Sequence, residues 1–284
     1  KKGLKTGVWG AMNASRNNAK NCLFFFPDPW TFSEKAFPKK LNKFLDFPRY
    51  YSKNYLAPSF LTLFIKSINS ISLILESFNI KDLSIIFRKS LSYIFLNGLN
   101  NSSLFGLYDL ISVNLFILLK KRYDPSLSII FLNSLAHNQH HHWYRNKESK
   151  KIISCMKLLD FSLGRLLETC QSSDAIILFN ALGQKNVDGE KYCIYRQIDT
   201  KKLLKRLKVN YTKFEEGMTN DVHIFFDNYE FRNDAYKILS QCKIKGKNLF
   251  FVELGISQSN SLFFQIAYYE SLDKNSYFEI PYKK

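Results

Sequence analysis

The chain has 284 residues, of which 46% are hydrophobic and 16% aromatic, a composition that excludes a disordered protein and suffices for one large α/β domain or two small ones. Its formal net charge is +17, but the basic residues are scattered, so we expect a positive field that gathers an anionic small-molecule or glycan substrate, in preference to a nucleic-acid interface. The five cysteines lie far apart without a CxxC pair, which argues against a disulfide framework or zinc knuckle and predicts a cytoplasmic protein with reduced thiols.

Short apolar runs bounded by Gly, Pro, Asn or Asp predict β-strands along the chain. We expect strands at residues 4–10, 22–26, 127–133, 174–180, 191–196, 222–227, 249–254 and 261–268. Periodic apolar patterns between them predict helices at 59–78, 82–97, 103–121, 147–170, 200–208 and 231–241. Asp82 and Ser102 or Ser103 are the expected helix N-caps, and Gly98 is an expected C-terminal stop.

The segment 60–75 comes closest to a membrane span, but Lys66, Asn69 and several serines interrupt it before the ~18 uninterrupted apolar residues that a span needs. We therefore expect no transmembrane segment. Its apolar residues recur at helical spacing, which predicts an amphipathic helix that packs them against a core: Phe60, Phe64, Ile68, Ile71, Leu75 and Phe78. Because the chain opens on Lys1 and soon enters an apolar run, we also expect further sequence upstream.

Strands that alternate with helices predict an α/β fold with a mostly parallel sheet sandwiched by helices. Three consecutive helices over 59–121 interrupt this alternation and predict a helical cap inserted into a single domain that covers residues 1–284. Ligands bind such sheets at the carboxyl ends of the strands. Three stretches follow predicted strands there, and we expect a site where they converge: PDPWTF, SLAHNQHHHWYR and ALGQKN.

Four of the five histidines fall within residues 137–142. If a helix starts after Asn133, His137 and His141 lie four residues apart on one face with His140 beside them, a spacing that can hold one divalent cation. No carboxylate lies between Asp124 and Glu148 to complete such a site. Three interpretations stay open on local sequence: a metal site, an anion or sugar site, and a polar loop without a ligand.

Two further positions are candidates for the same site. In PDPW, two prolines fix the backbone around Asp28 and hold its carboxylate and Trp30 in set directions, although a simple strand-ending turn explains the pattern equally well. His223 opens an apolar strand, where a lone histidine is more often a core residue than a ligand. No GxGxxG or Walker pattern and no nucleophile-elbow context occurs in the chain.

In order and spacing, the motifs GVWGAMNA, FFFPDPWTF, FLNSLAHNQHHHW and GMTNDVHIFF resemble the alkaline phosphatase superfamily, in particular its type I phosphodiesterase/nucleotide pyrophosphatase-like branch. The resemblance covers about residues 4–230. It implies that a divalent metal, zinc in most members, is held by Asn133 at the position of the family's aspartate, by His137 and by the distant His223. Asp28, Trp30, His140 and His141 would then contact substrate.

The chain departs from the family pattern at three places. The second metal site of the family requires an Asp-His pair after the run IILF at 176–179, where Asn180, Ala181, Leu182 and Gly183 stand instead. Asn133 replaces a carboxylate, and the nucleophile and first-strand aspartate would lie upstream of Lys1. The resemblance therefore implies one metal site in preference to two, and leaves the catalytic nucleophile unknown.

These observations favour a divergent metal-dependent hydrolase of phosphate or sulfate esters, acting on nucleotide-sugar or glycan substrates, as in polysaccharide biosynthesis. Metal ions in such sites stabilise charge that develops in the transition state. The alternative is a catalytically inactive homologue that binds carbohydrate or another anion, suggested by the missing Asp-His pair. A nucleic-acid-binding protein is a third hypothesis, which rests on the net charge and the aromatic content.

Overall fold

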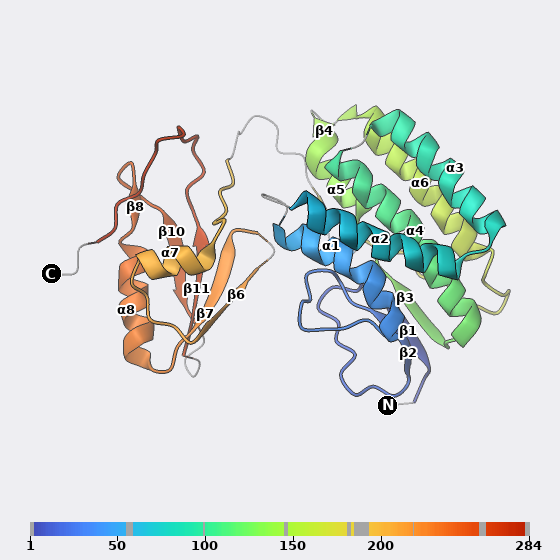
Figure 1. Ribbon diagram of the computed structural model, residues 1–284, viewed down its shortest axis with the longest axis horizontal. Helices are drawn as coiled ribbons and strands as arrows, with labels where there is room; N and C mark the ends of the chain where they lie inside the picture. Colours follow the sequence, from blue (N-terminus) through green and yellow to red (C-terminus); the bar gives the residue numbers. More distant parts are fainter. Residues whose placement is uncertain are drawn as a thin grey trace. The chain divides into compact units, whose positions relative to one another are not determined.

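The computed structural model describes residues 3–54, 59–98, 100–144, 147–180, 183–184, 193–217, 219–255 and 260–281. The chain divides into two compact units, Lys1–Asp188 and Gly189–Lys284, and each has a hydrophobic core of its own (Figure 1). The two units are described separately below. The expected single domain over residues 1–284 stays a prediction.

Unit 1 contains a small parallel sheet of three strands: β1 (Thr6–Trp9), β2 (Cys22–Phe26) and β3 (Leu127–Ile130). β1 lies in the middle and pairs in parallel with both neighbours. All three strands were predicted, and the mixed α/β class with a parallel sheet is confirmed. Gly7 in β1 is required because a Cβ there would lie 2.2 Å from the ring of Phe24 on β2.

The helices of unit 1 follow the predicted pattern closely, with α1 and α5 in addition. They are a 3-10 turn η1 (Lys39–Leu41), α1 (Asn42–Asn54), α2 (Phe60–Ser77), α3 (Ile80–Asn97), α4 (Asn101–Tyr123), α5 (Ser134–His142) and α6 (Lys150–Leu167), with a short hairpin of β4 (Trp143–Tyr144) and β5 (Lys147–Glu148) before α6. Gly98 ends α3 at a φ of 72°, as expected. The N-caps differ from the prediction: Asn79 caps α3 and Asn100 caps α4, each two or three residues before the expected residue. Asparagine caps as well as aspartate or serine, so residue type alone could not select the position.

The core of unit 1 lies between one face of the sheet and the helices. Trp9 stacks on Phe26 at a centroid distance of 4.1 Å, and Phe24 meets Phe116 of α4 edge-to-face at 5.6 Å. On the opposite face of β3, Leu127 and Ile129 are 47% and 42% exposed, so helices do not sandwich this sheet on both faces as expected. α4 contacts all three strands and is therefore a central core helix of unit 1, and the predicted cap insertion over 59–121 stays a prediction.

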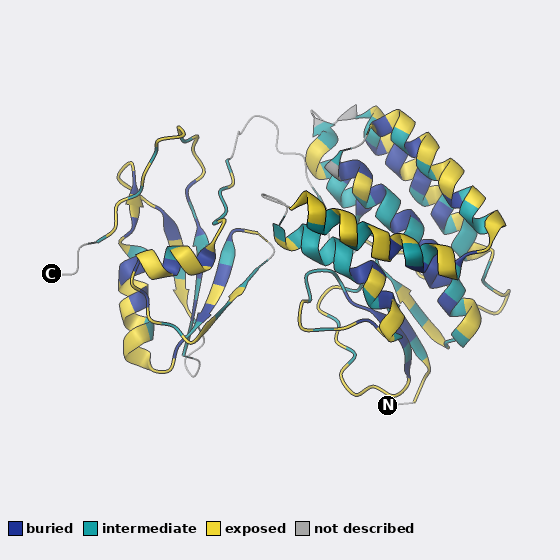
Figure 2. Ribbon diagram, in the orientation of Figure 1, coloured by how far each residue is buried: buried dark blue, intermediate teal, exposed yellow. Residues whose placement is uncertain are grey.

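The face of α2 that is buried is not the predicted one. Of the apolar residues expected to pack against the core, only Phe78 is buried, whereas Phe60, Phe64, Ile68, Ile71 and Leu75 are exposed (Figure 2). The helix buries Ser70 and Leu73 instead, and the Ser70 hydroxyl donates to the carbonyl of Lys43 in α1.

Two helices of the described part of the chain are long and apolar enough to cross a membrane by length and composition alone, Phe60–Ser77 and Ser102–Tyr123. The second has 67% of its window buried and is a core helix. The first has only 11% of its window buried, so the described residues leave most of its apolar surface uncovered.

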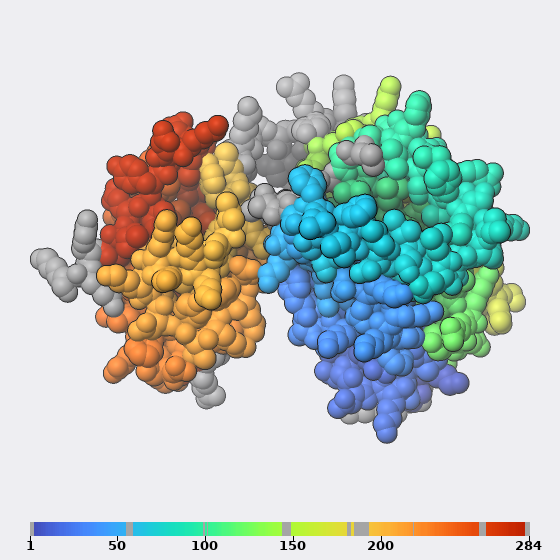
Figure 3. Space-filling model, viewed as in Figure 1, coloured from blue at the N-terminus to red at the C-terminus, as the bar shows by residue number. Residues whose placement is uncertain are grey.

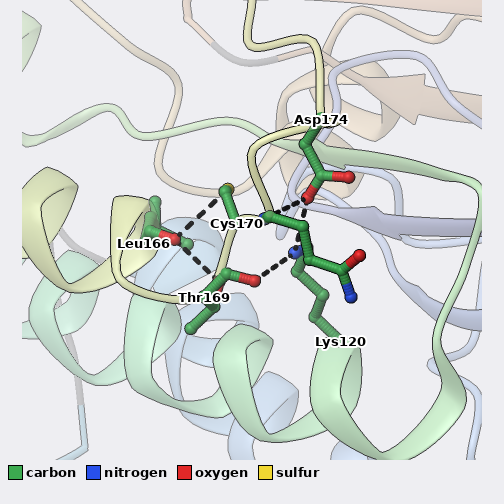
Figure 4. Close-up of polar contacts among 6 residues, drawn as sticks. Lys120, Leu166, Thr169, Cys170 and Asp174 are labelled. Atoms are coloured by element: carbon green, nitrogen blue, oxygen red, sulfur yellow. Dashed lines mark hydrogen bonds and ion pairs between the residues drawn. The ribbon is translucent and has the colours of Figure 1, made fainter.

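The strand predicted at 174–180 is absent. This segment has no regular secondary structure, and Ile177 and Phe179 are 82% and 76% exposed. The turn that leads into it is fixed at the end of α4, where Lys120 donates to the Thr169 carbonyl at 2.9 Å and pairs with Asp174 at 3.7 Å (Figure 4). An apolar run forms a strand only where a neighbouring strand supplies hydrogen bonds, and the sequence of the run does not show whether such a neighbour is present.

Unit 2 is built on an antiparallel sheet in the order β10-β11-β7-β6. Its elements are α7 (Thr200–Arg206), β6 (Lys213–Glu216), β7 (Asp221–Phe225), α8 (Tyr229–Ser240), a hairpin of β8 (Lys243–Ile244) and β9 (Lys247–Asn248), β10 (Phe250–Leu254) and β11 (Ser261–Ile266). The predicted strands at 222–227, 249–254 and 261–268 and helices at 200–208 and 231–241 are confirmed. The strands of this sheet, however, pair antiparallel. The chain segments that join β6 to β7 and β10 to β11 are too short for the crossover that a parallel pair requires. Residues 193–196 of the expected strand 191–196 are irregular, and 191–192 lie outside the described residues.

Candidate functional site

One pocket of unit 1 opens at the carboxyl end of the parallel sheet. The segments that follow all three strands contribute to it, together with helices α1, α4 and α5. Its described lining is Trp9, Gly10, Asp28, Pro29, Trp30, Phe47, Pro48, Tyr51, Ser52, Leu104, Phe105, Tyr108, Asp109, Phe131, Asn133 and His137. The PDPWTF and SLAHNQHHHWYR stretches therefore converge, as the strand-end rule predicts.

The turn after β2 holds Asp28 and Trp30 in fixed positions. The Asp28 carboxylate accepts the backbone N–H of Trp30 at 3.0 Å, and its carbonyl accepts that of Thr31 at 2.9 Å. Arg49 of α1 donates to the carbonyls of Thr31 and Glu34 and so ties this loop to the helix. Burial raises the pKa of Asp28, while the Trp30 N–H and the charge of Arg49 act in the opposite direction.

Asp109 lies beneath the start of α5. Its Oδ2 accepts the backbone N–H groups of Asn133 at 3.0 Å and Ser134 at 2.8 Å. Asn133 makes no side-chain cap bond, so this carboxylate from α4 satisfies the amide groups that a helix N-terminus leaves unpaired. Burial nevertheless raises the pKa of Asp109 to about 6.

His137 lies one helical turn after Asn133, with its ring stacked on Phe105 at a centroid distance of 3.5 Å. Burial, together with the nearby His140 and His141, lowers the pKa of His137 to about 4. The imidazole is therefore neutral near pH 7. In that state it can accept one hydrogen bond and donate another.

The other histidines of the cluster do not line the described pocket. His140 is exposed, its ring lies 6.4 Å from that of His137, and its Nε2 is 3.2 Å from the Gln184 amide nitrogen. His141 is also exposed, and His142 contacts the hydroxyl of Ser102 at 2.9 Å. A substrate role for His140 or His141 therefore requires a ligand that extends beyond the pocket.

His223 lies in unit 2, on the exposed face of β7, with its ring 5.1 Å from that of Phe263 on β11. Glu215 of β6 is its partner on the other side. Since each unit is described by itself, the predicted meeting of His223 with His137 stays a prediction.

The side chains of the pocket do not by themselves fit a zinc ion. Zinc sites use three or four nitrogen, sulfur or carboxylate ligands. No group of three or more His, Cys, Asp or Glu side chains able to hold an ion occurs among the residues that the structure describes. His137 is the one histidine in the described lining, and Asp109 already accepts two backbone bonds. The metal centre predicted from Asn133, His137 and His223 would depend on the ligand from unit 2.

Sequence reasoning missed the contribution of α4 to the pocket. Phe105, Tyr108 and Asp109 stand at i, i+3 and i+4 and present one helical face to it. Asp109 carried a signal, because it is the only acidic residue inside the apolar run 103–121. A buried carboxylate of this kind needs hydrogen-bond donors, and a functional or capping role follows from that need.

Comparison of the chain with protein-family models, with curated proteins and with solved structures gave no match. The resemblance to the alkaline phosphatase superfamily therefore stays a prediction that rests on the motifs alone.

Proposed function

We propose that the pocket of unit 1 binds a sugar ring of a glycan or sugar-containing substrate. The observation that carries the proposal is the combination of aromatic walls with a few fixed acceptor groups. Trp30, Tyr51 and Tyr108 offer ring faces for the C–H surface of a sugar, and Asp28 and Asn133 offer oxygens for its hydroxyl groups.

The charge of the pocket favours an uncharged ring over a bare anion. Its described lining includes the carboxyl groups of Asp28 and Asp109, a neutral His137 and no lysine or arginine. A phosphate placed against these carboxylates would be repelled at short range. The positive charge of the chain as a whole would act on acidic parts of the substrate outside the pocket.

A glycan-array screen followed by calorimetric titration of the hits tests this proposal. Trp30→Ala removes an aromatic wall, and Asp28→Asn removes a charged acceptor at nearly constant shape, so each should weaken binding about tenfold or more. Trp143→Ala is the matched control, since Trp143 lies at the end of α5 outside the described lining. Absence of glycan binding, or unchanged affinity in Trp30→Ala, would reject the proposal.

Metal-assisted hydrolysis of a phosphate or sulfate ester is the second candidate. It is supported by the presence of Asn133 and His137, two residues that the family resemblance assigns to the metal, in one pocket with Asp28. Aryl phosphate mono- and diesters with added zinc or manganese test it. Turnover that a chelator abolishes and His137→Ala removes would favour this candidate, whereas glycan binding unaffected by chelator and without turnover would favour the first.

A further inference from the structure

Helix α2 exposes its most apolar side chains. We define the apolar stripe as Phe60, Leu61, Phe64, Ile65, Ile68, Ile71 and Leu75, all of which are exposed, Phe60 to 85%. Their spacing places them on one side of the helix. The opposite side packs on α1 and contains serines and Leu73, so the helix faces its own protein with its less apolar side.

Helix α3 continues this surface after a two-residue connection. Ile80, Phe87, Leu91 and Phe95 follow i, i+7, i+11 and i+15 spacing, and all are exposed, Phe95 to 90%. Figure 3 shows both helices on the visible surface of unit 1, α2 in light blue and α3 in teal. An exposed apolar surface of this extent marks a binding surface rather than ordinary solvent exposure.

The charges around these helices are positive. Residues 39–97 contain nine lysines and arginines and three aspartates and glutamates, a net charge of +6. Two of the three acids are neutralised by ion pairs, Glu76 with Lys43 and Asp82 with Arg165, each at 3.0 Å. Lys81 and Arg88, in contrast, are exposed beside the apolar residues of α3.

We propose that α2 and α3 dock unit 1 onto an anionic lipid bilayer, with α2 lying in the plane of the interface. An exposed apolar stripe next to unneutralised cations is the combination that binds anionic membrane surfaces. At 18 residues, α2 is about 27 Å long, which would allow its stripe to enter the headgroup region along its whole length. Because its other side packs on α1, lipid contacts only one side of the helix, so it lies on the bilayer and does not cross it.

Flotation of the full chain with vesicles tests the proposal. The protein should float with vesicles of phosphatidylglycerol and phosphatidylcholine in equal parts, and much less with phosphatidylcholine alone. Phe64→Ser with Ile68→Ser should weaken binding at least about tenfold. Lys81→Gln with Arg88→Gln should weaken it by roughly fivefold per charge and reduce its sensitivity to salt. Phe251→Ser, a change of a half-exposed phenylalanine in unit 2, should leave it unchanged.

Three outcomes would overturn the proposal. The first is absence of flotation with anionic vesicles, or equal flotation of the wild type and the Phe64→Ser, Ile68→Ser variant. The second is a dimer, detected by light scattering, that this variant dissociates while vesicle binding is absent, because the stripe would then contact a second copy. The third is protein that alkaline carbonate does not release from the vesicles, because α2 would then span the bilayer. Circular dichroism of the variants excludes loss of folding as a cause.

Discussion

Two groups in the wall of the pocket change charge in opposite directions on folding, and their effects on stability can be separated. Asp109 has a pKa of about 6 in the folded chain against 3.8 in the absence of structure, because burial disfavours the carboxylate. His137 has a pKa of about 4 against 6.5, because burial disfavours the imidazolium. The folded state therefore binds an extra proton at Asp109 between pH 3.8 and 6, and lacks one at His137 between pH 4 and 6.5.

The signs of the two contributions follow from this proton balance. Stability falls with rising pH where the folded state holds more protons than the unfolded state, and rises where it holds fewer. Asp109 therefore lowers the free energy of unfolding as pH rises through its window, and His137 raises it. At about 1.4 kcal/mol for each pH unit between the folded and unfolded pKa values, the contribution of Asp109 is about 3 kcal/mol. The contribution of His137 is reduced by solvent screening to roughly 2 kcal/mol, because its ring is partly exposed.

The wild type should consequently show little net slope from these two groups between pH 4 and 6.5, and each single variant should reveal the other group. Asp109→Asn keeps an oxygen for the N–H groups of Asn133 and Ser134 but cannot ionise, so its free energy of unfolding should rise by about 2 kcal/mol between pH 4 and 6.5, the contribution of His137 alone. His137→Gln should show a fall of about 3 kcal/mol over the Asp109 window, the contribution of Asp109 alone. Loss of stacking on Phe105 would shift its stability at every pH without changing the slope.

Urea unfolding followed by tryptophan fluorescence measures these slopes. All three tryptophans, at positions 9, 30 and 143, lie in unit 1, so the signal reports on that unit alone. Asp160→Asn is the matched control, because Asp160 is an exposed carboxylate on α6 of the same unit. If Asp109→Asn and His137→Gln keep the pH profile of the wild type, neither group titrates as the structure indicates and the reasoning is wrong.

Three further predictions concern other parts of the fold. Gly7→Ala should destabilise unit 1 by about 2 kcal/mol or more in urea unfolding, because its Cβ would lie 2.2 Å from the Phe24 ring. Gly164→Ala, at an exposed position of α6, should stabilise the unit by about 0.5–1 kcal/mol, and equal effects of the two changes would contradict the packing of β1 on β2. Thiol titration of the native protein should label at most Cys170 and Cys193 rapidly, since Cys22, Cys155 and Cys242 are buried, and fast labelling of a third thiol would argue against that burial. Unit 2, expressed as residues 189–284, should unfold cooperatively because its core is its own; a chain without a cooperative transition would show that it depends on unit 1.

Much of the secondary structure was predictable because it depends on local periodicity. The predicted helices and most strands are present, and the convergence of the turns at Asp28 and Asn133 follows from the parallel order of β1, β2 and β3. The face that α2 buries was not predictable. Periodicity shows that a helix has an apolar stripe, but whether protein or another medium covers that stripe is decided outside the helix.

The failed strand at 174–180 and the antiparallel sheet of unit 2 have a common reason. A strand is stabilised by its neighbours, so an apolar run specifies neither its partner nor its direction. Phe264 of β11 and Ile224 of β7 are buried in unit 2 because two strands pair around them, whereas Ile177 has no such neighbour among the described residues and stays exposed.

The contribution of α4 to the pocket could not be predicted from its sequence. Burial on most sides removes the amphipathic pattern of α4, so its sequence does not indicate which face serves the site. Yet the carboxylate of Asp109 holds the first turn of α5, and that turn sets the positions of Asn133 and His137. The affinity of a ligand that contacts Asn133 and His137 therefore depends on Asp109, even if the ligand does not contact Asp109. If the sugar-binding proposal holds, Asp109→Asn should change ligand affinity far less than Asp28→Asn, since Asp109 acts by positioning α5 and Asp28 by accepting a hydrogen bond from the sugar.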